Sequence, residues 1–279
     1  MKVGAVAWEC RPYASVAEYL AHAEQALALT EGCDLAVWPE QTTLGLLDDR
    51  LEFLGSDAVS YLGGQFEDVR QGLRHLVQGS GQDVLTGTHF VPTEFGVENR
   101  PLWLTDSGEA WELPGKNVLT QYEIHDWQMA PGNGLGLVGQ VGAAVCYDSE
   151  FPASGRALAE EGAFVLAVPY FTQDRFGYQR ILWCGRARAV ELQLYVVQAG
   201  LVGGLGREPV PSTYGQAAIL TPSLDGFPAD ATLAATSPGV EGAAIAELDL
   251  EYLAGARKSG DVRNWNDRDR GDWRVTFRE

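Results

Sequence analysis

Cysteine and histidine, the usual ligands of structural zinc, are scarce in this sequence. Its 279 residues include only four cysteines and four histidines. The cysteines form no Cys-x-x-Cys pair, which argues against a zinc site, and we expect neither a metal nor a cofactor. Unpaired cysteines also favour free thiols, which are typical of the reducing cytoplasm. The four positions are Cys10, Cys33, Cys146 and Cys184.

Basic residues are also in short supply. Lysine and arginine total 20, whereas aspartate and glutamate total 38, which gives a net charge of -18. Such a chain should not bind nucleic acid or an anionic membrane through general electrostatics. No signal-peptide pattern opens the sequence, and no apolar run approaches the ~20 residues of a membrane span. We therefore expect a cytoplasmic protein that acts on a small molecule.

Apolar residues, in contrast, make up 46% of the chain, which is enough for a large core. Short buried runs typical of strands alternate with longer stretches of helical spacing. This α/β pattern has no linker and no repeat, and it predicts one domain over residues 1–279. Strands are expected at 2–8, 33–38, 83–90, 101–104, 115–119, 141–145, 163–169, 193–199, 217–220 and 242–248, and helices at 15–29, 62–78, 153–162 and 178–191.

Residues 141–152 concentrate the features of a nucleophile site. The apolar run before Cys146 predicts a buried strand, and a polar turn and a helix-like segment follow it. A cysteine at this junction lies at the sheet edge, where free backbone N–H groups can lower a thiol pKa and hold an oxyanion. The alternative is a structural cysteine, because cysteine is among the most buried residue types.

Three charged residues add to this pattern. Glu40 directly follows a predicted strand, at an edge of the sheet where ligand groups are often found. Lys116 begins a predicted strand, and Glu123 follows it seven positions later. Each of the three could instead be a solvated surface charge, which is the usual state of such residues.

These residue types together supply what hydrolysis of an amide or nitrile requires. A thiolate attacks the carbon, and a carboxylate in a partly dry crevice takes the thiol proton. A lysine stabilises the developing oxyanion, together with the backbone N–H that follows the nucleophile. The same carboxylate can protonate the departing ammonia and activate the water that cleaves the thioester.

The motifs and their order resemble the nitrilase, or carbon–nitrogen hydrolase, superfamily, and the resemblance extends over nearly the whole chain. The matching segments are Trp38-Pro39-Glu40, Gly115-Lys116, Tyr122-Glu123, Pro131-Gly132, Cys146-Tyr147-Asp148-Ser149-Glu150-Phe151-Pro152, Gly185-Arg186-Ala187-Arg188-Ala189-Val190-Glu191 and Tyr195-Val196-Val197. Four ordered motifs are far more specific than any one of them.

The resemblance implies a role for each matching residue. Cys146 corresponds to the nucleophile, Glu40 to the general base and Lys116 to the lysine that stabilises the oxyanion. Glu123 corresponds to a second glutamate, which orients the lysine or the substrate. Tyr147 is expected to bind substrate through its main-chain N–H in the oxyanion hole.

The resemblance also implies an architecture. The family fold is a four-layer α-β-β-α sandwich, which dimerises into an eight-layer assembly. Helices that follow the nucleophile strand commonly form the dimer contact. We therefore expect a homodimer or larger homo-oligomer, with a contact built from the apolar positions Phe151, Leu158, Leu182 and Leu192.

The sequence departs from the family after the nucleophile. Many relatives place an arginine there that binds a substrate carboxylate, whereas this chain has Ser149 and Glu150. We expect Glu150 to bind substrate and to favour neutral or cationic amides over carboxylates. Alternatively, Glu150 is the buried partner of Arg186 or Arg188. A carboxylate substrate would need an arginine elsewhere, Arg175 first.

Other positions leave alternatives open. Tyr170 and Phe171 follow a predicted strand and are expected to line the substrate pocket, with packing as an equal alternative. Cys184, within a predicted helix, is expected to be buried rather than catalytic. His125 or His89 beside the nucleophile would indicate a Cys–His hydrolase instead.

The sequence therefore predicts an enzyme that hydrolyses a non-peptide carbon–nitrogen bond through a Cys146 thioester. A small amide is the expected substrate. A nitrilase or an N-carbamoyl amine hydrolase is the alternative within this class. A binding protein of the same fold without turnover is the alternative outside it, although the complete set of four polar residues argues against it.

Overall fold

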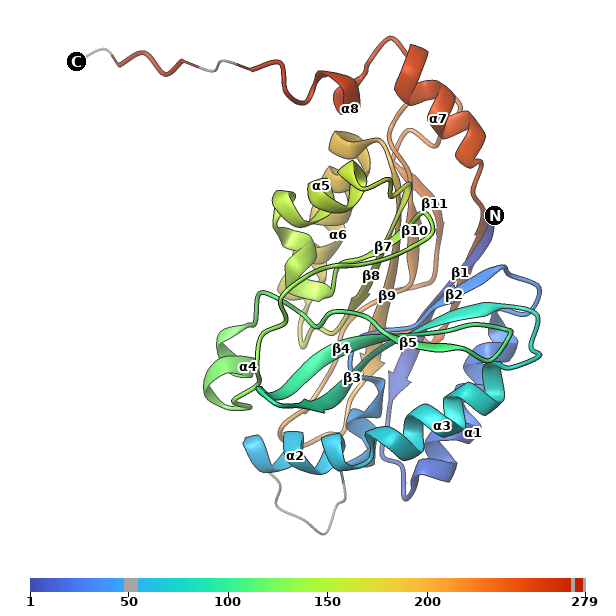
Figure 1. The fold of residues 1–279 in the computed structure, drawn as a ribbon, viewed down its shortest axis with the longest axis vertical. Coiled ribbons are helices and arrows are strands. Elements are labelled where there is room, and N and C mark those ends of the chain that lie inside the picture. Colours follow the sequence, from blue (N-terminus) through green and yellow to red (C-terminus); the bar gives the residue numbers. More distant parts are fainter. Residues whose placement is uncertain (48–54, 272–273, 278–279) are drawn as a thin grey trace.

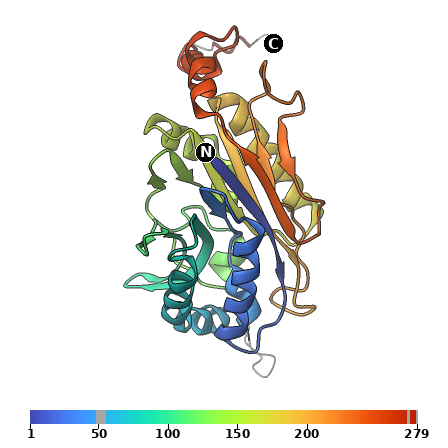
Figure 2. The same cartoon turned by 90° about the vertical axis from the view of Figure 1, so that its right-hand side faces the viewer.

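Two β-sheets lie back to back at the centre of the molecule, with helices on both outer sides (Figure 1). The computed structural model describes residues 1–47, 55–271 and 274–277. Over those ranges, no helix has both the length and the apolar character needed to cross a bilayer. Figure 2 shows the same arrangement turned by 90°.

The first sheet carries its helices on one face. From edge to edge its strands are β5 (Ala110–Glu112), β4 (Gly96–Leu104), β3 (Asp83–Thr93), β2 (Leu35–Val37), β1 (Lys2–Cys10) and β12 (Gly242–Glu247). Its helices are α1 (Val16–Leu29), α2 (Ser56–Gly64) and α3 (Phe66–Val77), and the 3₁₀ helix η1 (Thr42–Leu46) lies between α1 and α2 in the chain.

The second sheet joins the first because β1 changes partners along its length. Residues 3–5 of β1 pair with β2, whereas residues 8–10 pair with β9. The strands of the second sheet are β6 (Gly136–Val138), β7 (Val141–Ala143), β8 (Val165–Tyr170), β9 (Tyr195–Gly203), β10 (Ala218–Leu220) and β11 (Thr232–Ala235). Its covering helices are α5 (Pro152–Glu160) and α6 (Arg175–Leu192).

Three apolar layers hold the sandwich together. One lies between α1, α3 and the first sheet, one between the two sheets, and one between the second sheet and α5 and α6. Strand β8 shows why, because Val165 and Ala167 enter the layer between the sheets while Leu166 and Val168 face the helices. The chain therefore has the expected α-β-β-α sandwich.

Parallel pairing brings the segments that follow three strands to the same edge of the sheets. Strands β1 and β2 are parallel, and so are β7, β8 and β9. Glu40 follows β2, Cys146 follows β7 and Phe171 follows β8. Since the carboxyl ends of parallel strands lie at one edge, segments far apart in sequence meet there.

Local signals placed several elements correctly. Ser15 caps α1, and its side chain accepts a hydrogen bond from the Glu18 N–H.

The single helix expected at 62–78 is wrong, because α2 and α3 are separate helices that meet at Gln65. The strand expected at 115–119 is also wrong, because that segment is irregular. The remaining elements are η2 (Cys146–Glu150), α4 (Gln121–His125), α7 (Leu250–Ser259) and α8 (Asn264–Asp267).

The expected dimer contact needs a correction. Leu158, Leu182 and Leu192 are buried in the layer between the second sheet and its own helices. They pack within one subunit and are not available to a partner. Of the four positions predicted for that contact, Phe151 alone is exposed.

Candidate active site

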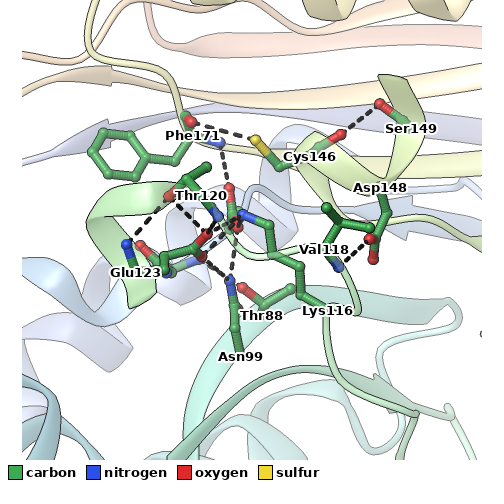
Figure 3. A network of polar contacts seen from close by, with 12 residues as sticks. Thr88, Asn99, Lys116, Val118, Thr120, Glu123, Cys146, Asp148, Ser149 and Phe171 are labelled. Carbon is green, nitrogen blue, oxygen red and sulfur yellow. Dashed lines mark hydrogen bonds and ion pairs between the residues drawn. The ribbon is translucent and has the colours of Figure 1, made fainter. Parts of the chain in front are cut away.

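The turn after β7 presents the Cys146 thiol at the sheet edge (Figure 3). Cys146 has a φ of +44°, in the left-handed region that a residue other than glycine rarely adopts. The Ser149 hydroxyl donates to the Cys146 carbonyl at 2.6 Å and helps to hold this turn. Strained backbone of this kind clusters at functional sites, and the structure keeps it here with a specific hydrogen bond.

Asp148 ties the nucleophile turn to the loop that carries the lysine. Its two carboxylate oxygens accept from the backbone N–H groups of Asn117 at 3.0 Å and Val118 at 2.8 Å. Lys116 has no strand to hold it, so these bonds fix the chain immediately after it. Asp148 thus couples the positions of Cys146 and Lys116, a role that the sequence did not reveal.

Lys116 bridges the two glutamates inside the protein. Its Nζ lies 2.9 Å from Glu40 Oε1 and 2.9 Å from Glu123 Oε1. All three side chains are at most 5% exposed. The alternative of three solvated surface charges is therefore wrong, and the structure brings the predicted residues together.

The short helix α4 explains the position of Glu123. Thr120 caps this helix, and Glu123 Oε2 accepts from the Thr120 N–H at 2.8 Å and from its hydroxyl at 2.9 Å. This reciprocal capping box fixes Oε2, and Lys116 Nζ lies 2.9 Å from both carboxylate oxygens of Glu123. The sequence Thr-x-x-Glu carried the signal for this helix start.

Asn99, on β4, is a member of this network that the sequence analysis missed. Its side-chain Nδ2 donates to Glu40 Oε1 at 2.7 Å and to Glu123 Oε1 at 3.3 Å. Its backbone carbonyl accepts from the backbone N–H of Lys116 at 2.8 Å. One asparagine therefore contacts all three charged residues. No local motif marked it, because its partners are distant in sequence.

Burial and charge set the protonation of these groups. Burial raises the pKa of Glu40, an effect that Lys116 offsets in part. Burial alone would lower the pKa of Lys116, but the Glu123 and Glu40 carboxylates raise it well above its ordinary value. Burial and the nearby Glu40 carboxylate raise the pKa of the Cys146 thiol well above its ordinary value. At rest Cys146 is therefore a thiol, which would need a base in order to act as a nucleophile.

The backbone of Phe171 connects this base to the thiol. Its N–H donates to Glu40 Oε2 at 2.9 Å, and its carbonyl accepts from the Cys146 thiol at 3.5 Å. Glu40 is thus held from three sides, by Lys116, Asn99 and Phe171. A carboxylate fixed in this way keeps the same geometry in every encounter with the thiol.

A cavity of about 310 Å³ opens over the network. Its lining includes Cys146, Tyr147, Glu150 and Phe171, as expected. Tyr170 is different: it is not among the described residues that line the cavity, and its hydroxyl donates to the Gln216 carbonyl at 2.8 Å. The expectation that Tyr170 lines the pocket is therefore wrong, because its ring is buried in the layer beneath α6.

A family model for carbon–nitrogen hydrolases matches residues 2–258. The chain belongs to the carbon–nitrogen hydrolase family. It is 32% identical over 251 residues to the probable hydrolase YhcX of Bacillus subtilis, which covers 88% of this chain and 49% of that protein. The chain thus spans about half the length of this curated relative.

Solved structures of the nitrilase superfamily share the fold. An amidase from Nesterenkonia sp. AN1, with acrylamide added at its active-site cysteine, superposes with a TM-score of 0.70 at 23% identity, over 92% of this chain and 97% of that chain. The carbon–nitrogen hydrolase XC1258 of Xanthomonas campestris superposes with a TM-score of 0.75 at 20% identity, over 99% of both chains.

Glu150 of this carbon–nitrogen hydrolase has a different partner from the one predicted. Its carboxylate lies 3.3 Å from Arg180 on α6, and both residues line the cavity. Arg188 instead pairs with Glu191 at 2.7 Å and donates to the Glu150 backbone carbonyl, while Arg186 binds Thr232. The alternative of Glu150 as the buried partner of Arg186 or Arg188 is wrong.

The arginine that lines the cavity is also not the one predicted to bind a substrate carboxylate. Arg175 lies over the Tyr214 ring and is not among the described cavity residues, whereas Arg180 is. The arginine that lines the cavity is therefore Arg180, five residues further along α6 than the predicted Arg175.

The histidines of the rival hypothesis lie outside this carbon–nitrogen hydrolase cavity, as far as the described residues define it. His125 is exposed and bonds to Gln121 at 3.1 Å. His89 is buried and bonds to the Thr86 hydroxyl at 3.0 Å. The group positioned to act on Cys146 is therefore Glu40 rather than an imidazole.

Proposed function

We propose that this chain hydrolyses a small amide through a Cys146 thioester. The observation that carries the proposal is the convergence of Cys146, Glu40 and Lys116 on one cavity of about 310 Å³. A thiol with a raised pKa, a fixed carboxylate and a buried ammonium are the nucleophile, base and oxyanion stabiliser that acyl transfer needs.

The first half of the reaction forms the thioester. Glu40 takes the thiol proton as Cys146 Sγ attacks the amide carbonyl carbon, whose oxygen becomes an oxyanion. The Lys116 ammonium and the Tyr147 N–H stabilise that oxyanion. The tetrahedral intermediate collapses when the carbon–nitrogen bond breaks, and the departing nitrogen takes the proton from Glu40 and leaves as ammonia.

The second half of the reaction releases the acid. Glu40 is again a carboxylate, and it removes a proton from a water that attacks the thioester carbon. The second tetrahedral intermediate expels Cys146 Sγ, which recovers its proton from Glu40. Glu123 contributes a second ion pair to Lys116 beside that of Glu40, which holds the ammonium in place as charge develops.

Two candidates remain beside an amidase. A nitrile or an N-carbamoyl amine would react at the same cysteine with the same base, and a protein that binds without turnover would use the same cavity. The structural neighbour from Nesterenkonia sp. is named an amidase, which favours an amide. The complete, hydrogen-bonded set around Lys116 favours turnover.

Ammonia release from amides, nitriles and carbamoyl amines tests the proposal. Primary amides should give the highest kcat/KM. Cys146→Ala should abolish turnover, whereas Cys184→Ala, at the partly exposed thiol of α6, should leave it unchanged. Turnover of a true amide substrate by Cys146→Ala near the parent rate would contradict the thioester route.

We also propose that the chain acts as a cytoplasmic homodimer. The four free cysteines suit a reducing compartment. Phe176 and Trp183, seven positions apart on α6, are 80% and 61% exposed. A dimer should appear by light scattering at micromolar protein, and Trp183→Glu should yield a monomer. A fully active, monomeric parent would contradict this assembly.

A further inference from the structure

The outer part of the catalytic cavity has its own charge pattern. Its described lining includes four carboxylates but only two cations. The Lys116 ammonium is already shared between two of those carboxylates, Glu40 and Glu123. The groups left to meet the distal end of a substrate are therefore Glu150, Asp174 and Arg180.

The Glu150 side chain is less exposed than that of Arg180, and its position is better fixed. Its side chain is 15% exposed, because it ends the buried turn that starts at Cys146, whereas the Arg180 side chain is 57% exposed. Arg180 approaches both oxygens of Glu150 with the same atom, Nε, at 3.3 Å. A long contact to a solvated arginine is weak, so another cation can replace Arg180 at little cost.

Aromatic rings form much of the remaining wall. Tyr122, Trp127, Tyr147 and Phe171 all line the cavity. The faces of such rings attract cations and repel anions. A wall of aromatic rings and carboxylates therefore favours an ammonium group with an apolar stem over a carboxylate.

We propose that the substrate is a primary amide whose acyl chain ends in an ammonium group, which displaces Arg180 and binds Glu150. This rests on the proposed amide hydrolysis at Cys146 and names its substrate class. Asp174 adds a second carboxylate at the exposed rim of the cavity, where α6 begins. The net charge of -18 attracts such a substrate from a distance.

The spacing of Cys146 and Glu150 along η2 guides the choice of acyl-chain length for a test substrate. Cys146 and Glu150 are the first and last residues of η2. At a rise of about 2 Å per residue, their backbones lie about 8 Å apart along that helix. An extended chain advances about 1.2 Å per bond, so about six bonds separate the carbonyl carbon from the ammonium nitrogen.

Three amides of matched length test this assignment. The cationic substrate is 6-aminohexanamide, the neutral one is heptanamide, and the anionic one is the monoamide of heptanedioic acid. Turnover is measured as ammonia release, and binding is measured by calorimetry in the Cys146→Ala variant. The parent should prefer 6-aminohexanamide to heptanamide by about tenfold in kcat/KM, since a charge-assisted hydrogen bond is gained.

Variants separate the cavity carboxylate from overall charge. Glu150→Gln should lower kcat/KM and affinity for 6-aminohexanamide about tenfold or more, so that the preference for it over heptanamide is lost. Arg180→Gln should raise affinity for the cationic amide, because it removes the competing cation. The control variant is Glu94→Gln, in the exposed turn between β3 and β4. It changes the net charge by as much as Glu150→Gln does, but it should change neither kcat/KM nor affinity for 6-aminohexanamide.

The outcomes distinguish this inference from the proposed function. Hydrolysis of 6-aminohexanamide and heptanamide at equal rates, unaffected by Glu150→Gln, would overturn the inference and leave the amidase proposal standing. A preference for the anionic amide that Arg180→Gln removes would also overturn it, with Arg180 as a carboxylate anchor. Binding of 6-aminohexanamide that depends on Glu150, with no hydrolysis of any amide, would support the inference and contradict the proposed function.

Discussion

Two ion-pair systems face the same cavity and differ in almost every respect. Lys116 and its two glutamates are at most 5% exposed, with contacts of 2.9 Å and further hydrogen bonds from Asn99 and Thr120. Arg180 and Glu150 meet at 3.3 Å, and the arginine is 57% exposed. The buried system has one arrangement, whereas the outer pair can open for a ligand.

This difference separates chemistry from selection. Groups that act on the reacting atoms gain from fixed positions, because reorganisation during the reaction costs rate. Groups that recognise the rest of a substrate must first release whatever they hold. The predictions below test whether the two systems really differ in this way, from the largest expected effect to the smallest.

Lys116→Met should damage both stability and rate. It leaves Glu40 and Glu123 buried without their shared cation, which costs about 3–5 kcal/mol of unfolding free energy when a buried pair is broken. Loss of an oxyanion donor should lower kcat about 10²–10³-fold. Urea unfolding and ammonia release measure the two effects. A variant with parent stability would show that the buried network is no more rigid than the outer pair.

The pH profile of kcat/KM should report the buried system. Burial raises the pKa of Glu40 above its ordinary 4.5, so the rate should fall by about tenfold per pH unit below an acid limb that lies above 4.5. The pKa values of Cys146 and Lys116 are raised well above 9.0 and 10.5, so the rate should stay level through pH 9. An alkaline limb near pH 8 would contradict a resting thiol.

Asn99→Leu should have an intermediate effect. It removes the amide N–H groups that bridge Glu40 and Glu123 but keeps a side chain that branches at Cγ. We expect kcat to fall about tenfold and the acid limb to move to higher pH, because the Glu40 carboxylate loses a hydrogen bond. A lower kcat with an unmoved acid limb would indicate a merely structural role for Asn99.

Arg180→Gln should have the smallest effect on stability. An exposed ion pair typically contributes 0–1 kcal/mol, so we expect a change of unfolding free energy below about 1 kcal/mol. The same urea titration used for Lys116→Met gives the comparison directly. A loss of about 3 kcal/mol or more would mean that the outer pair is structural and would erase the distinction.

Sequence motifs located the residues that we propose to react but not the residues that hold them. Glu40, Lys116, Glu123 and Cys146 each lie in a short motif of recognisable order, and the fold brings them together. Asn99 contacts partners 59 and 24 residues away in sequence, so no local pattern could reveal it. Arg180 lies 30 residues from Glu150 in sequence, so no local pattern could reveal that pair either.

Errors in the sequence analysis have a similar origin. Lys116 was expected on a strand, but tertiary hydrogen bonds from Asp148 to the next two residues override the local apolar pattern. Tyr170 was expected in the cavity, but alternation along β8 directs its ring to the helix side and leaves Phe171 at the cavity. Alternation predicts which residues share a face, and tertiary packing decides which face meets the ligand.

The central claim is that Glu40 takes the proton of the Cys146 thiol so that a thioester can form. Intact mass spectrometry after rapid acid quench of the parent with a primary amide tests it most directly. The account predicts an acyl adduct on the peptide that contains Cys146, formed at least about 10²-fold more slowly in Glu40→Gln. Adduct formation by Glu40→Gln at the parent rate, or parent turnover without any adduct at Cys146 under conditions where hydrolysis limits the rate, would contradict it.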